Sequence, residues 1–277
     1  MKYQGYTGRY LQIHLTTREI VIRPLSEKLT EHYIGGVGLA AAFISERLPV
    51  VIDPLAADNP LIFMAGPLTG TIIPWSGRHC VAAISPLTGI WGESYAGGTW
   101  GRELKRAGYD GLVITGRSDT LVFIKIADRR VSVEDAALLR GKDTYETETL
   151  VRKLCGCDAS VAAIGCAGEN LVRFASVMHD GKAARAAGRC GLGAVMGSKN
   201  LKAVAVKGSN EIPLFERERL AASIRAAMPE LVNSDDHRFK KAHGVFSMFL
   251  SDRRYGVNNW RDADLPGFRE SFTLELE

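Results

Sequence analysis

The chain has 277 residues, of which 46% are hydrophobic and 24% are charged, and its formal net charge at pH 7 is +4. These values predict an ordinary globular core. No apolar run approaches the length of about 18 residues that a membrane span needs, which argues against a membrane protein. No stretch interleaves basic with aromatic residues, which argues against a nucleic-acid-binding protein.

The start of the chain and its cysteines both point to the cytoplasm. Residues 1–17 contain no apolar segment and no small-residue cleavage site, so we expect no signal peptide. An odd number of cysteines in a chain of this length argues against a disulfide framework and for a reducing compartment. The five are Cys80, Cys155, Cys157, Cys166 and Cys190. Their spacing does not fit a four-thiolate cluster, so we expect structural roles.

Many short strands and a few helices are expected along the chain. Alternating or apolar residues predict strands at 9–15, 19–23, 61–65, 81–84, 111–115, 121–126, 130–133 and 160–164. Helices are predicted at 26–34 (with Ser26 as N-cap), 39–46, 97–107 and 144–154. This mixture predicts an α+β fold rather than a doubly wound parallel sheet.

A faint internal repeat predicts that the fold is duplicated. A strand, a glycine-led helix start and a strand that ends in glycine each occur twice. The pairs are 81–84 with 161–164, 96–101 with 191–197, and 111–116 with 202–208. Two related halves could clasp one ligand with two equivalent turns.

The sequence changes character after Pro213, where a charged helical stretch replaces the glycine-rich strands. We therefore predict one domain over residues 1–212 and the beginning of a helical second domain over residues 213–277. The second segment is too short to bury a full core alone.

Three glycine-rich segments look suited to an anionic ligand. They cover residues 66–78, 85–101 and 180–202. Glycine allows a ligand to approach backbone N–H groups closely. Two of the three segments also carry an arginine that can form a bidentate contact with phosphate. A single loop of this kind would be an ordinary connection, but three of them favour an anion site.

Basic side chains cluster in these segments. Arg78, Arg185 and Arg189 are the arginines. Three lysines in the last segment are open to two interpretations, phosphate capture or a solvated surface. They are Lys182, Lys199 and Lys202.

The sequence shows anion binding without an evident catalytic group. The histidines have no ligand-like spacing, and no nucleophile–base pair can be identified. Residues 36–41 imitate a dinucleotide fingerprint without a convincing strand before them, and residues 193–200 lack the Gly-Lys-Ser/Thr order of a P-loop. The combination favours a cofactor that brings its own chemistry.

Several long segments, in the same order, resemble the aldehyde:ferredoxin oxidoreductase family. They include Gly108-Tyr-Asp-Gly-Leu-Val-Ile, Gly165-Cys-Ala-Gly-Glu-Asn-Leu-Val and Gly193-Ala-Val-Met-Gly-Ser-Lys-Asn-Leu-Lys-Ala-Val. The resemblance covers residues 5–210 closely and the tail only loosely. It implies an N-terminal domain of two related halves beneath a bis-pterin cofactor of tungsten or, less in keeping with the family, molybdenum.

The resemblance also implies site residues. Arg78 matches a phosphate or pterin contact. Tyr95 and Ala186 match the two backbone carbonyls that bind a magnesium ion between the pterin phosphates. The full cofactor-binding set is Gly77, Arg78, Tyr95, Ala96, Gly97, Gly98, Arg185, Ala186, Ala187, Gly188 and Arg189. The family usually has glycine where Cys190 stands. No catalytic side chain is expected within this chain.

The resemblance implies a fragment or subunit that needs further sequence. The complete enzyme would oxidise an aldehyde to a carboxylic acid and pass electrons through a [4Fe-4S] cluster to ferredoxin, with cluster ligands that are not in this chain. A separately encoded C-terminal part and a homo-oligomer are both compatible with this interpretation. The alternatives are a fragment of a benzoyl-CoA reductase-type catalytic subunit, and a non-catalytic pterin-binding module or inactive truncated product.

Overall fold

The computed structural model describes residues 4–45, 53–156 and 158–244. The chain divides into two compact units, Met1–Phe215 and Glu216–Glu277. No helix among the described residues is long and apolar enough to cross a membrane. The domain boundary that the sequence predicts between residues 212 and 213 stays a prediction.

The first half of the first unit is a six-stranded sheet. Its strands lie in the order β2-β1-β6-β3-β4-β5. Only β1 and β6 pair in parallel, and the other neighbours are antiparallel. The strands are β1 (Arg9–His14), β2 (Glu19–Pro24), β3 (Leu61–Ala65), β4 (His79–Ile84), β5 (Trp91–Ala96) and β6 (Gly111–Thr115).

The second half repeats this arrangement. Its sheet has the order β11-β10-β9-β12-β7-β8, with β7 and β12 parallel and the other pairs antiparallel. Adding six to each strand number of the first sheet gives the second sheet in reverse order, so the predicted duplication is confirmed. The strands are β7 (Val122–Ala127), β8 (Arg130–Asp135), β9 (Ser160–Ala163), β10 (Val177–His179), β11 (Arg185–Ala187) and β12 (Leu201–Lys207).

One of the three predicted repeat pairs is wrong. Residues 81–84 lie in β4, whose equivalent is β10, whereas residues 161–164 begin in β9, whose equivalent is β3. Both segments are buried runs of small apolar residues, and similar burial produces similar sequences without equivalence. The other two pairs, the helix starts and the strands that follow them, do occupy equivalent places.

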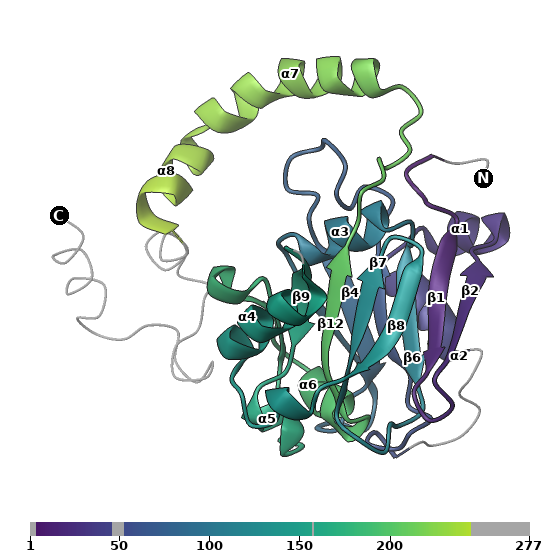
Figure 1. Ribbon diagram of the computed structural model, residues 1–277. Helices are drawn as coiled ribbons and strands as arrows, with labels where there is room; N and C mark the ends of the chain where they lie inside the picture. Colours follow the sequence, from purple (N-terminus) through teal and green to yellow (C-terminus); the bar gives the residue numbers. More distant parts are fainter. Residues whose placement is uncertain (1–3, 46–52, 157, 245–277) are drawn as a thin grey trace, which may run out of the picture. The chain divides into compact units, whose positions relative to one another are not determined.

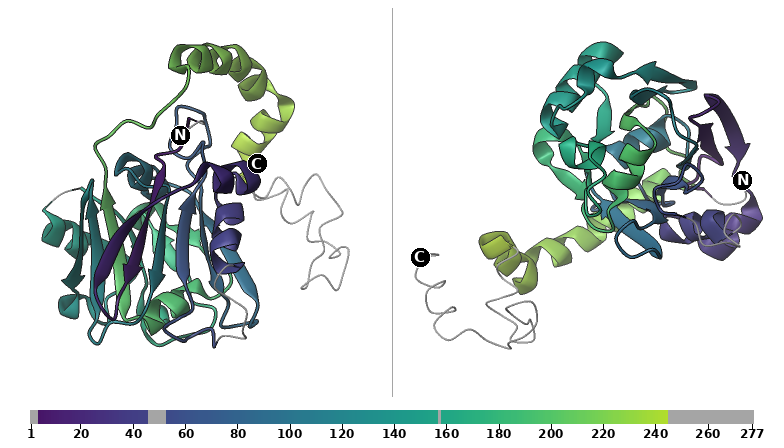
Figure 2. Two further views of the ribbon diagram at one scale, coloured as in Figure 1. Left: turned by 90° about the vertical axis from the view of Figure 1, so that its right-hand side faces the viewer. Right: turned by 90° about the horizontal axis from the view of Figure 1, so that it is seen from below.

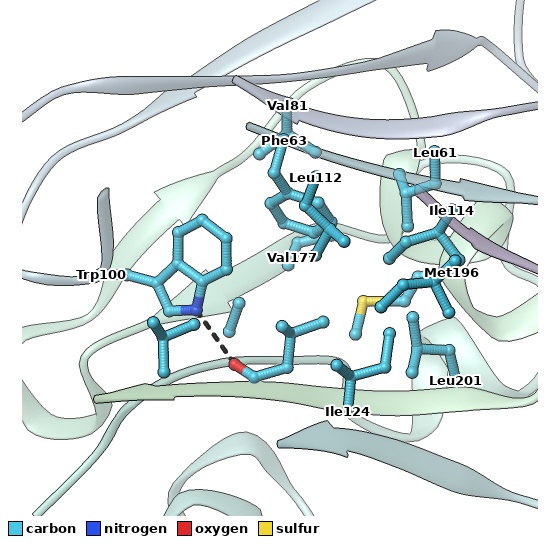
Figure 3. Packing of buried hydrophobic residues seen from close by; sticks show 14 of the residues in the cluster. Leu61, Phe63, Val81, Trp100, Leu112, Ile114, Ile124, Val177, Met196 and Leu201 are labelled. Atoms are coloured by element: carbon cyan, nitrogen blue, oxygen red, sulfur yellow. Dashed lines mark hydrogen bonds between the residues drawn. The ribbon is translucent and has the colours of Figure 1, made fainter. Parts of the chain in front are cut away.

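The two sheets face each other (Figure 1), and one apolar core fills the space between them. Helices α3 (Trp100–Arg106) and α6 (Leu192–Ser198) contribute to it, and each contacts strands of both sheets. Seen from below, α6 lies between the sheets (Figure 2). Figure 3 shows Trp100 in this core, close to Phe63 of β3, with its indole N–H donating to the Val204 carbonyl of β12 at 3.0 Å. A side chain between the sheets thus joins the two halves.

Helices cover the outer face of each sheet. On the first sheet, α1 (Glu27–Tyr33) and α2 (Val37–Ser45) follow β2, and Leu39 and Phe43 of α2 pack on the sheet. On the second, η1 (Ala137–Leu139) and α4 (Thr144–Cys155) follow β8, and Val151 packs on the sheet. The two pairs of helices stand at the same point of the repeat.

Local signals explain where two of these helices begin. The predicted N-cap is confirmed, because the Ser26 hydroxyl accepts the Leu29 N–H at 3.3 Å. At α4, Asp143 and Glu146 form a reciprocal capping box. The remaining short elements, β5, β10, β11 and α5 (Cys166–Glu169), were not predicted. The last three have only three or four residues, too few for a periodic pattern.

The second unit contains two helices among its described residues. They are α7 (Arg217–Asn233) and α8 (Asp235–His243), in agreement with the helical segment predicted after Pro213. Ser234 caps α8 by accepting the His237 N–H at 3.2 Å. The rest of the predicted helical segment, 245–277, lies outside the described residues.

Candidate cofactor site

The site lies where the end strands of the two sheets meet. Strand β5 ends the first sheet and β11 ends the second. The Arg189 N–H donates to the Ser94 hydroxyl at 3.4 Å, and the Cys190 thiol donates to the Glu93 carbonyl at 3.3 Å. A Cβ on Gly92 would lie 2.8 Å from the Cys190 Cβ, so only glycine fits this crossing.

An open hollow of about 530 Å³ lies at this junction, and we call it the cradle. All three predicted glycine-rich segments reach it, although they are separated by up to a hundred residues. Its lining residues are Trp75, Gly77, Arg78, Tyr95, Gly97, Gly98, Ala184, Arg185 and Ala186. The geometry therefore assembles one site from both halves, as an anion clasp requires.

Four predicted site residues do not line the cradle. Ala96 and Ala187 are fully buried in the core between the sheets. Gly188 and Arg189 are exposed and continue the chain directly after β11. Alternation explains the two alanines, because neighbouring residues of a strand point to opposite faces. Trp75 and Ala184 line the cradle without having been predicted.

Two unpaired arginines give the cradle its charge. Arg78 and Arg185 are both exposed, and neither forms an ion pair with any residue that the structure describes. Lys182 is exposed in the same loop as Arg185. Uncompensated guanidinium groups beside a concave surface attract anions and can form bidentate contacts with phosphate.

Asp180 joins the two halves beside the cradle. Its carboxylate accepts the Thr99 N–H at 2.5 Å and the Thr99 hydroxyl at 2.9 Å. Thr99 precedes α3 of the first half, whereas Asp180 follows β10 of the second. Gly98 has a φ of +87°, and a Cβ there would collide with the Asp180 carboxylate. Gly98 thus lets the two loops approach each other.

Gly97 leaves open space in the cradle. A Cβ built on it would meet no atom within 4 Å, and its φ lies outside the left-handed region. The backbone therefore does not require glycine at this position, and Gly97 leaves open space where it lines the cradle. Together with the unpaired arginines, this open backbone fits a large ligand that carries phosphate.

The Tyr95 side chain is held along β5. Its hydroxyl donates to Glu93 Oε1 at 3.0 Å, and Trp91 donates to the other oxygen of Glu93 at 2.9 Å. Burial and this hydrogen bond raise the pKa of Tyr95 to about 12, so the phenol stays neutral. Tyr95 and Ala186, the predicted magnesium ligands, stand in equivalent edge strands, and their metal binding stays a prediction.

A buried histidine pair lies next to the cradle. His79 follows Arg78 in sequence, and His179 precedes Asp180. Their Nε2 atoms are 3.2 Å apart, and His79 also packs on the Trp100 ring at a centroid distance of 4.8 Å. Burial lowers the pKa of both rings, and for His179 the value falls to about 4. Sequence offered no signal for this pair, since the two residues lie a hundred positions apart.

Two lysines considered for phosphate binding have structural roles instead. Lys199 is fully buried and donates to the Ala57 carbonyl at 2.8 Å. Lys202 is fully buried and binds the Glu169 carboxylate and, at 2.7 Å, the Lys142 carbonyl. Neither phosphate capture nor a solvated surface therefore describes these two lysines. Their glycine-rich sequence neighbourhood carried no information about burial.

The fold is thus a duplicated α+β domain with one cradle between its halves. The family profile described as "Aldehyde ferredoxin oxidoreductase, N-terminal domain" matches residues 10–208. The chain belongs to this aldehyde ferredoxin oxidoreductase family.

Curated relatives agree. The chain is 43% identical over 230 residues to a tungsten-containing aldehyde ferredoxin oxidoreductase of Pyrococcus furiosus, covering 83% of this chain and 38% of the relative. A protein of the same description from Thermococcus kodakarensis gives the same identity and coverage. The WOR-like subunit of an aliphatic sulfonate oxidoreductase of P. furiosus is 33% identical over 276 residues, covering 93% of this chain and 44% of that subunit. The chain therefore spans about two fifths of the length of these relatives.

A solved structure shares the fold. The BamBC active-site complex of benzoyl coenzyme A reductase, in complex with 1,5-dienoyl-CoA, superposes with a TM-score of 0.81 at 36% identity. The match covers 84% of this chain and 35% of the solved one. Aldehyde ferredoxin oxidoreductases and the benzoyl coenzyme A reductase complex thus both contain this domain as one part of a longer chain.

Proposed function

We propose that this chain is the pterin-binding part of an oxidoreductase that oxidises aldehydes to carboxylic acids. The observation that carries the proposal is the convergence of Arg78, the end of β5 with Gly97 and Gly98, and the start of β11 on one cradle. Two unpaired arginines and an open glycine backbone at this junction support a role in holding a phosphate-bearing ligand. The names of the relatives make a tungsten cofactor the most fitting occupant.

Each part of the cradle has a task in this proposal. Arg78 and Arg185 would bind phosphate groups of the pterin cofactor. The backbone carbonyls of Tyr95 and Ala186 would hold a magnesium ion. Gly97 and Gly98 provide the close backbone approach. When bound, the metal–pterin group supplies the two-electron chemistry, and this chain orients it.

Further sequence would complete the enzyme. No group of three or more metal-binding side chains occurs among the described residues. We propose that sequence equivalent to the remaining length of the relatives supplies the [4Fe-4S] ligands, covers the cradle and contacts ferredoxin. The partner part is encoded either in the same chain or separately, and the protein works in the cytoplasm.

A benzoyl-CoA reductase-type subunit is the second candidate function. The similarity to the BamBC complex favours it, because that solved structure has the same domain at 36% identity. Against it stand the higher identity to the aldehyde enzymes and the segment Gly66-Pro-Leu-Thr-Gly-Thr with Arg78, which resembles the aldehyde branch.

Turnover by a completed protein distinguishes these functions. Residues 1–210 would replace the equivalent part of the P. furiosus relative, and the chimera would be assayed with an aldehyde and a viologen dye, and with a cyclic dienoyl-CoA. We expect aldehyde oxidation by the chimera and none by the 277-residue chain alone. Turnover of the thioester and not of the aldehyde would favour the second candidate. Turnover of neither by a chimera that carries pterin would favour a non-catalytic module.

A further inference from the structure

Trp75 lines the cradle without a partner in the protein. Its side chain is 71% exposed. Among the residues that the structure describes, none forms a hydrogen bond, an aromatic contact or a cation–π contact with its ring. The other two described tryptophans, Trp91 and Trp100, donate the indole N–H to protein oxygens at 2.9 and 3.0 Å. The Trp75 ring therefore faces solvent at the edge of a proposed binding site.

The backbone at Trp75 is strained. Its φ of +61° lies in the left-handed region, which glycine adopts freely and a bulky residue rarely adopts. Such a conformation costs free energy and is found mainly at functional sites, where the surrounding structure holds it in place. Packing of the ring does not offset this cost, because the ring is exposed. The outlier therefore favours a role for the side chain outside the core.

The loop that carries Trp75 is closed at its base. The Thr69 hydroxyl donates to the Arg78 carbonyl at 2.9 Å. The Gly70 N–H donates to the carbonyl of Ser76, the residue after Trp75, at 3.1 Å. These two bonds hold the segment between β3 and β4 together on both sides of its tip. Trp75 and Arg78 thus belong to one closed loop and line the same hollow.

The cradle combines positive charge with an aromatic side chain. Arg78 and Arg185 are unpaired cations that suit phosphate, and Trp75 adds a large flat ring to the same lining. Aromatic side chains stack on heteroaromatic rings with little dependence on the identity of the ring. An inorganic anion would use the arginines alone. The combination fits a ligand in which phosphate and a flat heteroaromatic ring lie close together.

We propose that Trp75 is a binding residue of the cradle whose indole stacks on the heteroaromatic ring of a phosphate-bearing ligand of the pterin class. The inference rests on the proposed function and extends it, because no residue assigned there contacts the ring. Tyr95, the other aromatic residue of the cradle, is tied to Glu93 through its hydroxyl. The Trp75 ring has no such tie and can adjust to a bound ring.

Calorimetric titration of the 277-residue chain with two probes tests this role. 6-Hydroxymethylpterin diphosphate carries both a ring and phosphate, whereas inorganic diphosphate carries phosphate alone. We expect the wild type to bind the pterin probe about tenfold more tightly than inorganic diphosphate. Trp75→Leu should remove this preference and leave the affinity for inorganic diphosphate unchanged. Trp75→Phe keeps an aromatic ring and should retain most of the preference.

A matched control and a spectroscopic readout separate stacking from a structural role. Phe174 is 72% exposed and does not line the cradle, so Phe174→Leu should bind both probes as the wild type does. Stacking on indole quenches the emission of a pterin ring by electron transfer. The bound probe should therefore emit more strongly on Trp75→Leu than on the wild type.

Three outcomes would overturn the role of Trp75 alone. In the first, Trp75→Leu keeps the full preference for the pterin probe. In the second, it weakens both probes equally, which would assign the residue to the shape of the loop. In the third, it binds both probes normally but lowers the melting temperature of the chimera with the P. furiosus relative more than Phe174→Leu does, because protein chain would then cover the indole.

Failure of the cradle itself has a different signature. The wild type would bind neither probe, or would bind both no better than a variant with Arg78→Gln and Arg185→Gln. Either result would overturn the proposed function and, with it, the role of Trp75. Arg117→Gln, which changes an exposed arginine outside the cradle, is the control for this double variant.

Discussion

The Nε2 atoms of His79 and His179 lie 3.2 Å apart in the core between the two sheets. Strands β4 and β10, which carry them, hold the same place in the two halves. Arg78 of the cradle directly precedes His79, and Asp180, which lies beside the cradle, directly follows His179. The pair therefore connects the two halves at the point where the site is assembled.

This pair should make stability depend on pH. Burial lowers the pKa of both rings below the ordinary value of 6.5, and to about 4 for His179. The unfolded chain therefore binds protons between pH 6.5 and 4 that the folded chain does not, and stability falls as pH falls through this window. Between pH 7 and pH 5 we expect a loss on the order of 2 kcal/mol from His179 alone.

Urea denaturation at pH 7 and pH 5 measures this loss. In the matched control, both histidines are changed to Leu, which fills the same space without a titrating group. The free energy of unfolding of this double variant should change less between the two pH values. Equal pH dependence in both proteins would show that the pair is not the cause.

Gly97→Ala should weaken pterin binding without unfolding the chain. Its Cβ would meet no protein atom within 4 Å, and Gly97 lines the cradle, so the added methyl group would take up space beside the proposed cofactor. We expect pterin affinity to fall about tenfold. Gly165→Ala is the control, because its Cβ would meet only ordinary contacts at Thr144. The pterin content of the two purified variants decides the matter, and equal content would contradict the role assigned to Gly97.

Asp180 and Thr99 should be energetically coupled. Asp180→Asn keeps a residue type that tolerates the left-handed backbone at φ +57° but weakens two hydrogen bonds between the halves. We expect each of Asp180→Asn and Thr99→Ala to lower the free energy of unfolding by about 1–3 kcal/mol. The double variant should lose less free energy of unfolding than the sum of the two single losses. Additive losses would mean that the contact does not stabilise the junction.

Lys202→Met should lower stability and leave cofactor binding intact. It leaves the Glu169 carboxylate without its buried ion-pair partner, which costs about 3–5 kcal/mol. Lys202 does not line the cradle, so the folded fraction should bind as much pterin as the wild type. A stable variant that lacks pterin would restore the phosphate-binding interpretation of this lysine.

The sequence predicts the regular part of this fold well. Strands such as Leu61–Ala65 and Gly111–Thr115 are long apolar runs, and burial on both faces produces such runs directly. The caps at Ser26 and Asp143 act within three residues and are visible in the sequence. The duplication could be predicted from repeated glycine patterns, because glycine marks backbone geometry that both halves need.

The site was predictable only in part. Glycine and arginine identified the segments that form the cradle. Ala96 and Ala187 of these segments point into the core instead, because side chains alternate between the two faces of a strand. Contacts between distant segments left no local pattern, so the histidine pair and the buried lysine ion pair could not be foreseen. The strand β11 has only three residues and is defined by its partner β10 rather than by its own sequence.

The pterin content of arginine variants tests the central claim most directly. The chimera with the P. furiosus relative would be produced in medium that contains tungstate. Pterin and tungsten per chain would then be measured for three forms of the chimera. These are the wild type, the double variant Arg78→Gln with Arg185→Gln, and the control Arg117→Gln. We predict two pterins for each tungsten in the wild type and control, and at least a tenfold loss of both in the double variant. Unchanged pterin and tungsten in a folded double variant would contradict the claim that the cradle between β5 and β11 holds the cofactor.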